Sequence, residues 1–353
     1  IAVFLGASIL ADAFFVAFRL PNTFRRLFAE GTFNAAFIPS YTSAKIKNKK
    51  IGKVFADDVF SLLILILLLI VTLAEIFTPY LVYLIAPGFI TDDIKFNLAV
   101  ELTRITFPFL LFVSLSSFFS GILNSNNKFA AAAAAPIILN IILIVSILVS
   151  YFQNYNIAKQ LSYGVTIAGI SQLIYLIYFT LNFYKPNIKF NFKVTNRVKF
   201  FFKKLLPSIF SSGVTQINIL VGTIIASFQT GAVSYLYYAD RVYQINLAIA
   251  GIAVGTVSLP VLSKALKIKN LSKVSNIQNN SIELSLLLSI PASLGLIIAS
   301  KEIVNALFGY GSFTPDDVSM TSEALKFFGF GIIAFALVKI LANFFFARDN
   351  TKT

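Results

Sequence analysis

The chain has 353 residues, of which 57% are hydrophobic and only 12% are charged, and its mean hydropathy is +0.82. A soluble domain carries about 25% charged residues, so this composition excludes an ordinary soluble fold and predicts an integral membrane protein. The sequence has no Cys and no His, which excludes disulfide frameworks, thiolate sites, zinc hydrolases and Ser-His-Asp catalysis. We interpret the net charge of +14 as basic cytoplasmic loops beside anionic lipid, and not as nucleic-acid binding.

A helix that spans the membrane needs about 20 mostly apolar residues. After a short stub at 1–5, nine segments of the chain reach this length. In chain order they are 8–29, 55–84, 96–123, 131–152, 160–184, 205–229, 234–263, 280–300 and 317–347. The runs are too long for strands and do not alternate, so we expect an all-α polytopic membrane protein with about nine complete transmembrane helices.

The connections between these segments differ in charge. Those at 25–53, 185–204 and 264–273 together hold 18 of the 29 Lys and Arg residues, whereas the interleaved connections hold almost none. The positive-inside rule therefore places these three loops in the cytoplasm. Phe190, Phe192 and Phe200–Phe202 lie within the basic 185–204 segment, which fits either an amphipathic surface helix or a solvated loop with an aromatic belt.

Ionisable residues inside a membrane are costly and usually mark a cavity or a pathway. The segment 8–29 carries Asp12, Arg19, Arg25 and Arg26, and Glu30 follows it directly. Two simpler readings stay open here: the arginines reach the inner interface with their charged ends, and Asp12 is exposed near the outer end of the helix.

A second charged position, Asp240-Arg241, lies in the segment 234–263. Arg241 is expected to share a helix face with Tyr237 and Gln244, four residues before it and three after it. A structural ion pair between helices is the alternative for this arginine. A guanidinium is a planar fork that matches phosphate, so a cavity lined by Arg25 and Arg241 would suit a lipid phosphate or pyrophosphate head group.

Several motifs resemble those of one transporter family. They are the run from Ala11-Asp12-Ala13-Phe14-Phe15-Val16-Ala17-Phe18-Arg19-Leu20-Pro21-Asn22 to Arg25-Arg26-Leu27-Phe28-Ala29-Glu30-Gly31, then Ala86-Pro87-Gly88-Phe89, Ala135-Pro136 with Asn140, Tyr237-Tyr238-Ala239-Asp240-Arg241, Gly255-Thr256 with Leu259-Pro260, and Phe308-Gly309-Tyr310-Gly311 with Phe313-Thr314. With these motifs in this order, the sequence resembles the MurJ (MviN) family of bacterial lipid II flippases, within the multidrug/oligosaccharidyl-lipid/polysaccharide exporter superfamily.

The resemblance implies a two-lobed exporter fold with a central cavity. It places the N-terminal lobe in 1–184, a basic cytoplasmic linker in 185–204 and part of the C-terminal lobe in 205–353. Because the family has 14 helices, the chain is expected to be a fragment that lacks most of helix 1 and helices 11–14, and residues 1–353 alone are expected not to transport.

By motif position, the resemblance assigns substrate binding to Arg25, Arg241 and Asn22, and a role in the cavity or its gating to Asp12, Glu30 and Asp240. Gln244 departs from the family pattern, because many relatives have Glu there. No catalytic residue, metal or cofactor is implied, and the coupling ion and driving force stay open. The expected partners are lipid II, the undecaprenyl-pyrophosphate-linked disaccharide-pentapeptide, together with membrane lipids and cell-wall synthesis proteins.

The resemblance thus predicts a flippase, not an enzyme, that moves lipid II across the bacterial cytoplasmic membrane by alternating access. The nearest alternative is another exporter of the superfamily, moving a different lipid-linked oligosaccharide or a drug. A membrane enzyme that uses a polyprenyl phosphate is the third reading. It would need clustered carboxylates for a metal, and the acidic pairs Asp57-Asp58, Asp92-Asp93 and Asp316-Asp317 are too isolated for that.

Overall fold

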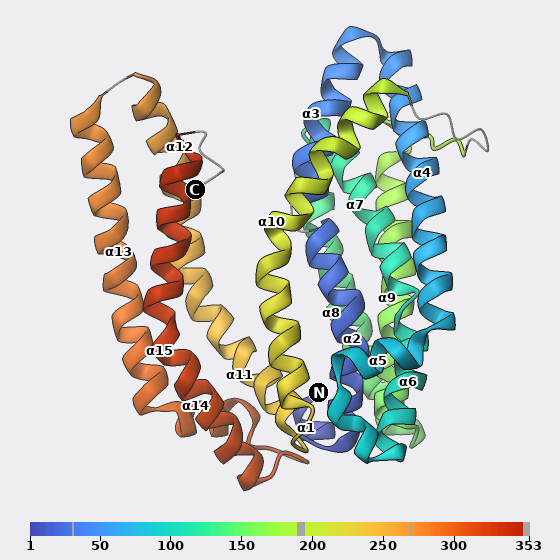
Figure 1. Cartoon of the computed structure of the whole chain (residues 1–353), viewed down its shortest axis with the longest axis vertical. Coiled ribbons are helices and arrows are strands. Elements are labelled where there is room, and N and C mark those ends of the chain that lie inside the picture. The colour runs from blue at the N-terminus through green and yellow to red at the C-terminus, as the bar shows by residue number, and fades with distance from the viewer. Residues whose placement is uncertain (30–31, 189–194, 269, 349–353) are drawn as a thin grey trace. The chain divides into compact units, whose positions relative to one another are not determined.

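A computed structural model describes residues 1–29, 32–188, 195–268 and 270–348, and every regular element in these ranges is a helix (Figure 1). The elements are α1 (Ala2–Leu5), α2 (Ile9–Ala29), α3 (Thr32–Lys47), α4 (Lys49–Ile76), α5 (Thr78–Ile85), η1 (Pro87–Thr91), α6 (Asp93–Thr106), α7 (Phe109–Ser125), α8 (Phe129–Gln153), α9 (Ile157–Thr180), α10 (Asn196–Ala226), α11 (Ala232–Leu247), η2 (Ala248–Ala253), α12 (Val254–Lys267), α13 (Leu271–Ile298), α14 (Ser300–Phe308) and α15 (Pro315–Phe346). The predicted all-α class is confirmed.

All nine segments expected to span the membrane are helical, but the count of nine is not matched in full. By length and composition, seven stretches of the described chain can cross a bilayer: Lys49–Ile76, Asp93–Ser125, Phe129–Gln153, Ile157–Thr180, Ala232–Leu266, Leu271–Ile298 and Pro315–Phe345. α2 is not among them because Asp12, Arg19, Arg25 and Arg26 make it too charged. Among the described side chains of α10, Gln216–Ala226 form a shorter apolar stretch.

The helices form two compact units. The larger unit comprises residues 8–233, and the smaller unit comprises residues 1–7 and 234–353. The larger unit includes α10, because this helix packs against α2, α3, α4 and α5. The two lobes expected from the sequence divide instead at 185–204. Such lobes are defined by how the parts move and not by contacts within one structure, so their boundaries remain a prediction.

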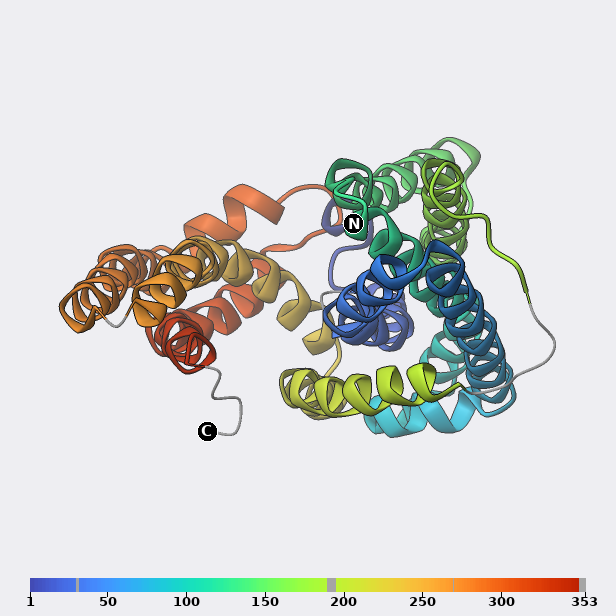
Figure 2. The ribbon, with the colours of Figure 1, turned by 90° about the horizontal axis from the view of Figure 1, so that it is seen from above.

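In the larger unit, α2 lies at the centre and packs against α3, α6, α7, α9 and α10 (Figure 2). Its first half is fully enclosed, since every side chain from Ala11 to Phe18 is buried. The rings of Phe14 and Phe18, one turn apart, stack with centroids 6.0 Å apart. A helix that carries several charges can therefore occupy the centre of the unit, because apolar and aromatic neighbours enclose the rest of its surface.

An aromatic core joins the basic ends of α3, α4 and α10 to α7. Its centre is Phe37, which is fully buried and whose ring contacts the rings of Phe33, Tyr41, Phe55, Phe118 and Phe201. Most of the connection 25–53 is thus the helix α3, with aromatic residues at a spacing of four. The segment 196–204 is also helical and its Phe201 is buried, whereas Phe190 and Phe192 lie outside the described residues.

A buried polar contact lies beside this aromatic core. The hydroxyl of Tyr184 donates to Asp57 Oδ1 at 2.7 Å, and both residues are buried. Burial raises the pKa of Tyr184, and the hydrogen bond to Asp57 adds to the rise. Burial also raises the pKa of Tyr41, with the nearby charge of Asp57 as the second cause.

The smaller unit consists of long helices with small residues between them, and α13 and α15 run side by side in it (Figure 1). Four serines spaced four apart on α13 are buried: Ser281, Ser285, Ser289 and Ser293. Ser285 donates to the carbonyl of Ala250 in η2 at 2.9 Å, and Ser293 to that of Gly329 in α15 at 2.8 Å. Small hydroxylated residues let helices approach closely in a membrane.

Residues 1–7 belong to the smaller unit through two hydrogen bonds. The N–H of Ser312 donates to the carbonyl of Val3 at 2.8 Å, and the Tyr238 hydroxyl donates to that of Gly6 at 2.9 Å. Gly6 has φ +57°, and a Cβ there would lie 2.3 Å from the Ser312 carbonyl oxygen. Only glycine fits this position without a shift of the backbone.

Candidate functional site

Arg25, the first of the two arginines expected to bind substrate, lies on the last turns of α2. It is half-buried, and its Nε donates to Asn22 Oδ1 at 2.9 Å, one turn earlier on the helix. The two residues assigned to substrate binding on α2 therefore contact each other. Asn22 thereby orients the guanidinium through its Nε.

The Arg25 side chain lines a cavity of about 130 Å³ inside the larger unit. The walls come from four helices: Arg25 of α2; Val113, Ser116, Ser117 and Ser120 of α7; Ala132, Ala135, Pro136 and Leu139 of α8; Gln172 and Leu176 of α9. Among these residues Arg25 is the one charged side chain. The cavity therefore combines a cation, three hydroxyls and one amide with an apolar wall.

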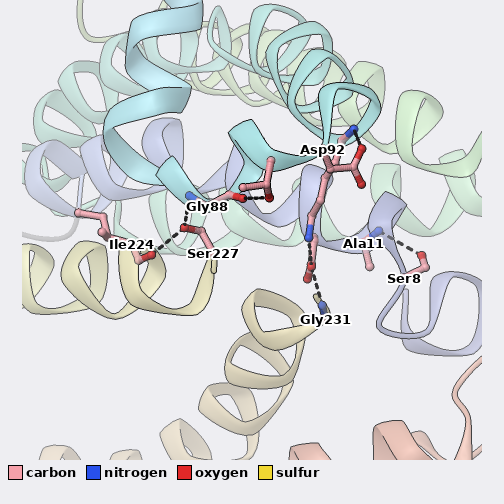
Figure 3. Close-up of polar contacts among 10 residues, drawn as sticks. Ser8, Ala11, Gly88, Asp92, Ile224, Ser227 and Gly231 are labelled. Carbon is pink, nitrogen blue, oxygen red and sulfur yellow. Dashed lines mark hydrogen bonds and ion pairs between the residues drawn. The ribbon is translucent and has the colours of Figure 1, made fainter. Parts of the chain in front are cut away.

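Asp12, expected at the cavity or its gate, is fully buried near the start of α2. Its Oδ2 accepts from Lys95 Nζ at 2.7 Å and from the backbone N–H of Gly231 at 2.8 Å (Figure 3). The alternative that Asp12 is exposed at the membrane interface is wrong. A carboxylate so enclosed needs such partners, because an unpaired buried charge is costly.

The sequence motifs did not single out Lys95, the partner of Asp12. The lysine lies on the first turn of α6, is 4% exposed, and also places its Nζ 4.1 Å from the centre of the Phe89 ring. Asp92 caps this helix by accepting from the backbone N–H groups of Ile94 and Lys95. The cap fixes the start of α6 and so helps to hold the lysine against Asp12.

Gly231 belongs to the segment between α10 and α11, and a second contact holds this segment. The N–H of Gly88 in η1 donates to Ser227 Oγ at 3.0 Å, and this hydroxyl donates in turn to the carbonyl of Ile224 (Figure 3). A Cβ at Gly88 would lie 2.4 Å from the Ser227 carbonyl carbon and oxygen, so a side chain does not fit there. Residues 227–231 are thus held at both ends, by Gly88 and by Asp12.

Arg241, the second expected substrate-binding arginine, lies on α11 in the smaller unit. Its guanidinium carbon lies 4.7 Å from the centre of the Tyr237 ring, so the predicted shared face of these two residues is confirmed. Within the described residues Arg241 forms no ion pair, and its buried Nε has no hydrogen-bond partner. The neighbouring carboxylate of Asp240 accepts from the Gln244 amide instead.

Two charged residues of the α2 motif cannot be placed. Glu30 lies outside the described residues, and so does the side chain of Arg26. In the described part of the chain, no three Asp, Glu, His or Cys residues gather as a metal site would require. The described candidate residues are thus the arginines Arg25 and Arg241, the carboxylates Asp12 and Asp240, and neighbouring hydroxyls and amides.

The fold is that of a known class of membrane exporters. A multidrug transporter of the MATE family, solved in an inward-facing conformation, matches with a TM-score of 0.67 over 96% of this chain and 81% of its own, at 13% identity. At this identity the match shows the fold alone.

The family follows from closer matches. The sequence pattern of the family described as "Lipid II flippase MurJ" matches residues 1–353, and the chain belongs to this family. Relatives called "Probable lipid II flippase MurJ" are each 42% identical: that of Rickettsia prowazekii over all of this chain and 69% of its own length, and that of Rhizobium meliloti over all of this chain and 67%.

A solved structure agrees with these sequence matches. It is titled "Lipid II flippase MurJ, inward closed conformation", and it matches with a TM-score of 0.87 and 29% identity over 99% of this chain and 72% of its own. The predicted family and fold class are confirmed. Family membership and the apolar helices make the chain a multi-pass transporter of the bacterial cytoplasmic membrane, not an enzyme.

Proposed function

We propose that the protein containing this chain moves lipid II across the cytoplasmic membrane by alternating access, with Arg25 and Arg241 binding the pyrophosphate of the substrate. The observation that carries the proposal is the family match over residues 1–353. Arg25 supports it further, because this cation lines a cavity among hydroxyls and amides. The chain makes and breaks no covalent bond in the lipid.

The chemistry of the two arginines supports this role. A guanidinium offers five N–H donors in a rigid fork, and a pyrophosphate offers acceptor oxygens to both ends of that fork. Asn22 takes one donor of Arg25, and the ring of Tyr237 supports the guanidinium of Arg241. Each arginine is thereby oriented by a neighbour.

We propose that the remaining motif residues act in gating. Asp12 holds the connection between α10 and α11 through Gly231, so a change in this contact would release the segment that links the two compact units. Asp240 orients Gln244 one turn along α11. Glu30 follows α2 directly and is assigned to the same role through its place in the motif.

The test is the rescue of bacteria depleted of their own lipid II flippase by the complete gene that encodes this chain. Arg25→Ala and Arg241→Ala should each abolish rescue at normal protein levels in the membrane, and Arg→Lys should rescue poorly because an ammonium lacks the bidentate fork. Arg104→Ala removes an exposed arginine of α6 and serves as the matched control. Normal rescue by both alanine variants would remove the pyrophosphate assignment.

The main alternative, export of another lipid-linked oligosaccharide, shares the pyrophosphate and so shares the site. A flipping assay in vesicles separates the two, with lipid II in one arm and an undecaprenyl-pyrophosphate oligosaccharide without the peptide in the other. The proposal requires faster flipping of lipid II. We propose cell-wall synthesis proteins as partners because they supply and consume this precursor, and co-purification with them tests that step.

The orientation in the membrane is also proposed. The basic connections 25–53, 185–204 and 264–273 are placed in the cytoplasm by their 18 Lys and Arg residues. Single cysteines at Lys49, Asn196 and Asn270 should resist an impermeant thiol reagent in intact cells and react after the membrane is opened. Ready labelling of any of them in intact cells contradicts this orientation.

A further inference from the structure

A second cavity of the larger unit lies at its basic end and has no part in the proposed transport site. It has a volume of about 410 Å³ and is lined by residues of the first turns of α4 and α10. We refer to it as the basic pocket. Its lining includes Lys50, Ile51, Val54, Phe55 and Asp58 of α4 and Arg197 of α10.

The basic pocket begins where α4 enters the membrane. The stretch of α4 that can cross a bilayer starts at Lys49. Lys50, Val54 and Asp58 follow one another at a spacing of four and so share one face of this helix. At a rise of 1.5 Å per residue, Lys50 and Asp58 lie about 12 Å apart along the helix axis. The pocket therefore runs from the membrane interface, on the side proposed to be cytoplasmic, toward the apolar interior.

Two cations of the pocket are available to a ligand. The side chains of Lys50 and Arg197 are exposed, and neither forms an ion pair among the described residues. The one carboxylate of the described lining is Asp58, which has an interaction of its own within the chain. Two cations thus stand against one carboxylate, and this excess attracts a negatively charged group.

The apolar wall of the pocket restricts the kind of anion. Val54 is 41% exposed and Ile51 is half-buried, so both present aliphatic surface to the cavity. The buried ring of Phe55 lies 6.1 Å, centre to centre, from the ring of Phe201 in α10, so aromatic residues join the two helices beside the pocket. A free inorganic anion gains nothing from aliphatic surface, whereas a phospholipid presents a phosphate and an acyl chain together.

The first turns of α10 have the pattern of a helix that lies at a membrane surface. Val198 and Phe201 are buried, whereas Arg197, Lys199 and Lys203 are exposed. Basic side chains on one face and apolar ones on the other are typical of helices in contact with anionic lipid. Of the two readings left open for this basic segment, its described part favours the amphipathic surface helix.

We propose that the basic pocket binds an anionic phospholipid of the cytoplasmic leaflet. Its phosphate lies between Lys50 and Arg197, and the first part of one acyl chain lies against Ile51 and Val54. The bound lipid thereby joins α4 to α10. This inference rests on the proposed orientation in the membrane and is independent of the pyrophosphate assignment to the two site arginines.

The test labels the purified complete protein in detergent with a phosphatidylglycerol that carries a photoreactive group on one acyl chain. Mass spectrometry locates the label, and labelling of residues 51–54 is followed against lipid concentration. The half-saturating concentration should rise about tenfold in Lys50→Gln and in Arg197→Gln, and more in the double variant, because each loses a charge-assisted contact. Phosphatidylethanolamine with the same photoreactive chain has no net charge and should label these residues far less well.

A variant with the same change of charge provides the matched control. Lys47 of α3 and Lys199 of α10 are exposed, form no ion pair among the described residues and do not line the pocket. Lys47→Gln/Lys199→Gln should therefore be labelled like the wild type. All these variants should unfold at the wild-type temperature, since only exposed side chains are changed, so lost labelling reports lost binding.

Three outcomes would overturn the inference. They are wild-type labelling of Lys50→Gln/Arg197→Gln, equal loss in the control variant, which would mark attraction to the basic surface as a whole, and equal labelling by phosphatidylethanolamine. Displacement of the lipid by inorganic phosphate would mark a simple anion site and overturn it too. The proposed function fails separately: normal rescue by Arg25→Ala and Arg241→Ala contradicts it and leaves the labelling of residues 51–54 unchanged.

Discussion

The two compact units are held together by different interactions. In the larger unit, the buried share of the apolar stretches ranges from 11% in α8 to 72% in α6 and α7, and aromatic rings and the Asp12–Lys95 pair connect the helices. In the smaller unit, the corresponding share is 33% for α11–α12 and 28% each for α13 and α15. One buried apolar cluster of its described residues consists of Val254, Leu262, Ala265, Val274, Ile340 and Phe344.

This difference shows two ways of joining helices that are themselves apolar. Lipid tails are as apolar as leucine, so burial of aliphatic side chains gives little drive for association inside a membrane. The smaller unit uses close approach and single hydroxyls, as in the contacts of Ser285 and Ser293, together with ring contacts of Tyr238 and Tyr243. The larger unit has, in addition, a buried ion pair and the ring cluster around Phe37. Substitutions should therefore have larger effects in the larger unit.

The largest effect is expected from the buried ion pair. Asp12→Ala leaves the ammonium of Lys95 buried without its partner, and breaking such a pair costs about 3–5 kcal/mol. The double variant Asp12→Asn/Lys95→Met should cost less than either single change, because no isolated charge remains. The free energies of unfolding of the single and double variants are measured on the purified proteins in detergent, with tyrosine fluorescence as the signal.

An exposed ion pair of the same unit provides the control. Lys159 pairs with Glu101 at side-chain exposures of 42% and 49%. Lys159→Met should leave the free energy of unfolding unchanged, since water and salt screen such a pair. If the double variant at Asp12 and Lys95 is less stable than both single variants, the ion pair is not what holds these helices.

The next effect concerns the aromatic core. Phe37→Ala should lower the free energy of unfolding by about 3–5 kcal/mol, because the fully buried ring leaves a cavity among five other rings. Phe344→Ala removes the largest side chain of the cluster in the smaller unit and should cost clearly less. Equal losses in thermal unfolding would contradict the difference between the units.

A moderate effect with a defined pH dependence is expected at Tyr184. Tyr184→Phe removes a donor from buried Asp57 and should cost about 1–3 kcal/mol. The raised pKa of Tyr184 means that the folded state keeps the proton at pH values where the unfolded chain loses it. Its contribution to stability is therefore complete below pH 10, the ordinary value for tyrosine, and declines as the pH rises further.

Denaturation at several pH values checks this expectation. The loss of stability above pH 10 should be smaller in Tyr184→Phe than in the wild type. Tyr80→Phe, which changes a side chain that is 71% exposed, should leave the slope unchanged. A wild-type slope in the Tyr184 variant would mean that other groups cause the alkaline loss.

The smallest effect is expected in the serine stripe of the smaller unit, by which we mean the buried Ser281, Ser285, Ser289 and Ser293 of α13. Ser293→Ala removes one hydrogen bond to α15 and should cost roughly 0.6 kcal/mol, a typical value between membrane helices. Ser289→Ala removes a buried hydroxyl that has no partner among the described residues, and should cause no loss. A loss at Ser289 equal to that at Ser293 would show that packing, not hydrogen bonding, accounts for the stripe.

The sequence predicts the helices well but predicts few of their partners. Long apolar runs identify the helical segments, although seven and not nine stretches of the described chain are long and apolar enough to cross a bilayer. The spacing of four places Arg241 on the ring of Tyr237. The connection 25–53 contains the helix α3, which its basic composition did not suggest. Phe33, Phe37 and Tyr41 are spaced by four as on one helix face, but only the tertiary structure shows the rings against which they pack.

The contacts of the candidate site require the tertiary structure. Asp12 and Lys95 are 83 residues apart, and no local pattern pairs them. The cavity beside Arg25 is lined by residues of four helices, so serines that look like ordinary residues of an apolar span come to lie beside Arg25. Periodicity fixes which face of one helix is polar, but the order in which helices pack decides which polar faces meet.

The π-helical segment η2, between α11 and α12, has a consequence for how this helix tolerates changes in length. A π-turn closes its hydrogen bonds over five residues in place of four, so it holds about one residue more than an α-turn does. Removing one residue from Ala248–Ala253 would restore an unbroken α-helix and keep Arg241 and Lys264 on their established faces. The same deletion in α13 would rotate everything beyond it by about 100°. Within this family, single-residue gaps in aligned sequences should therefore gather at η2.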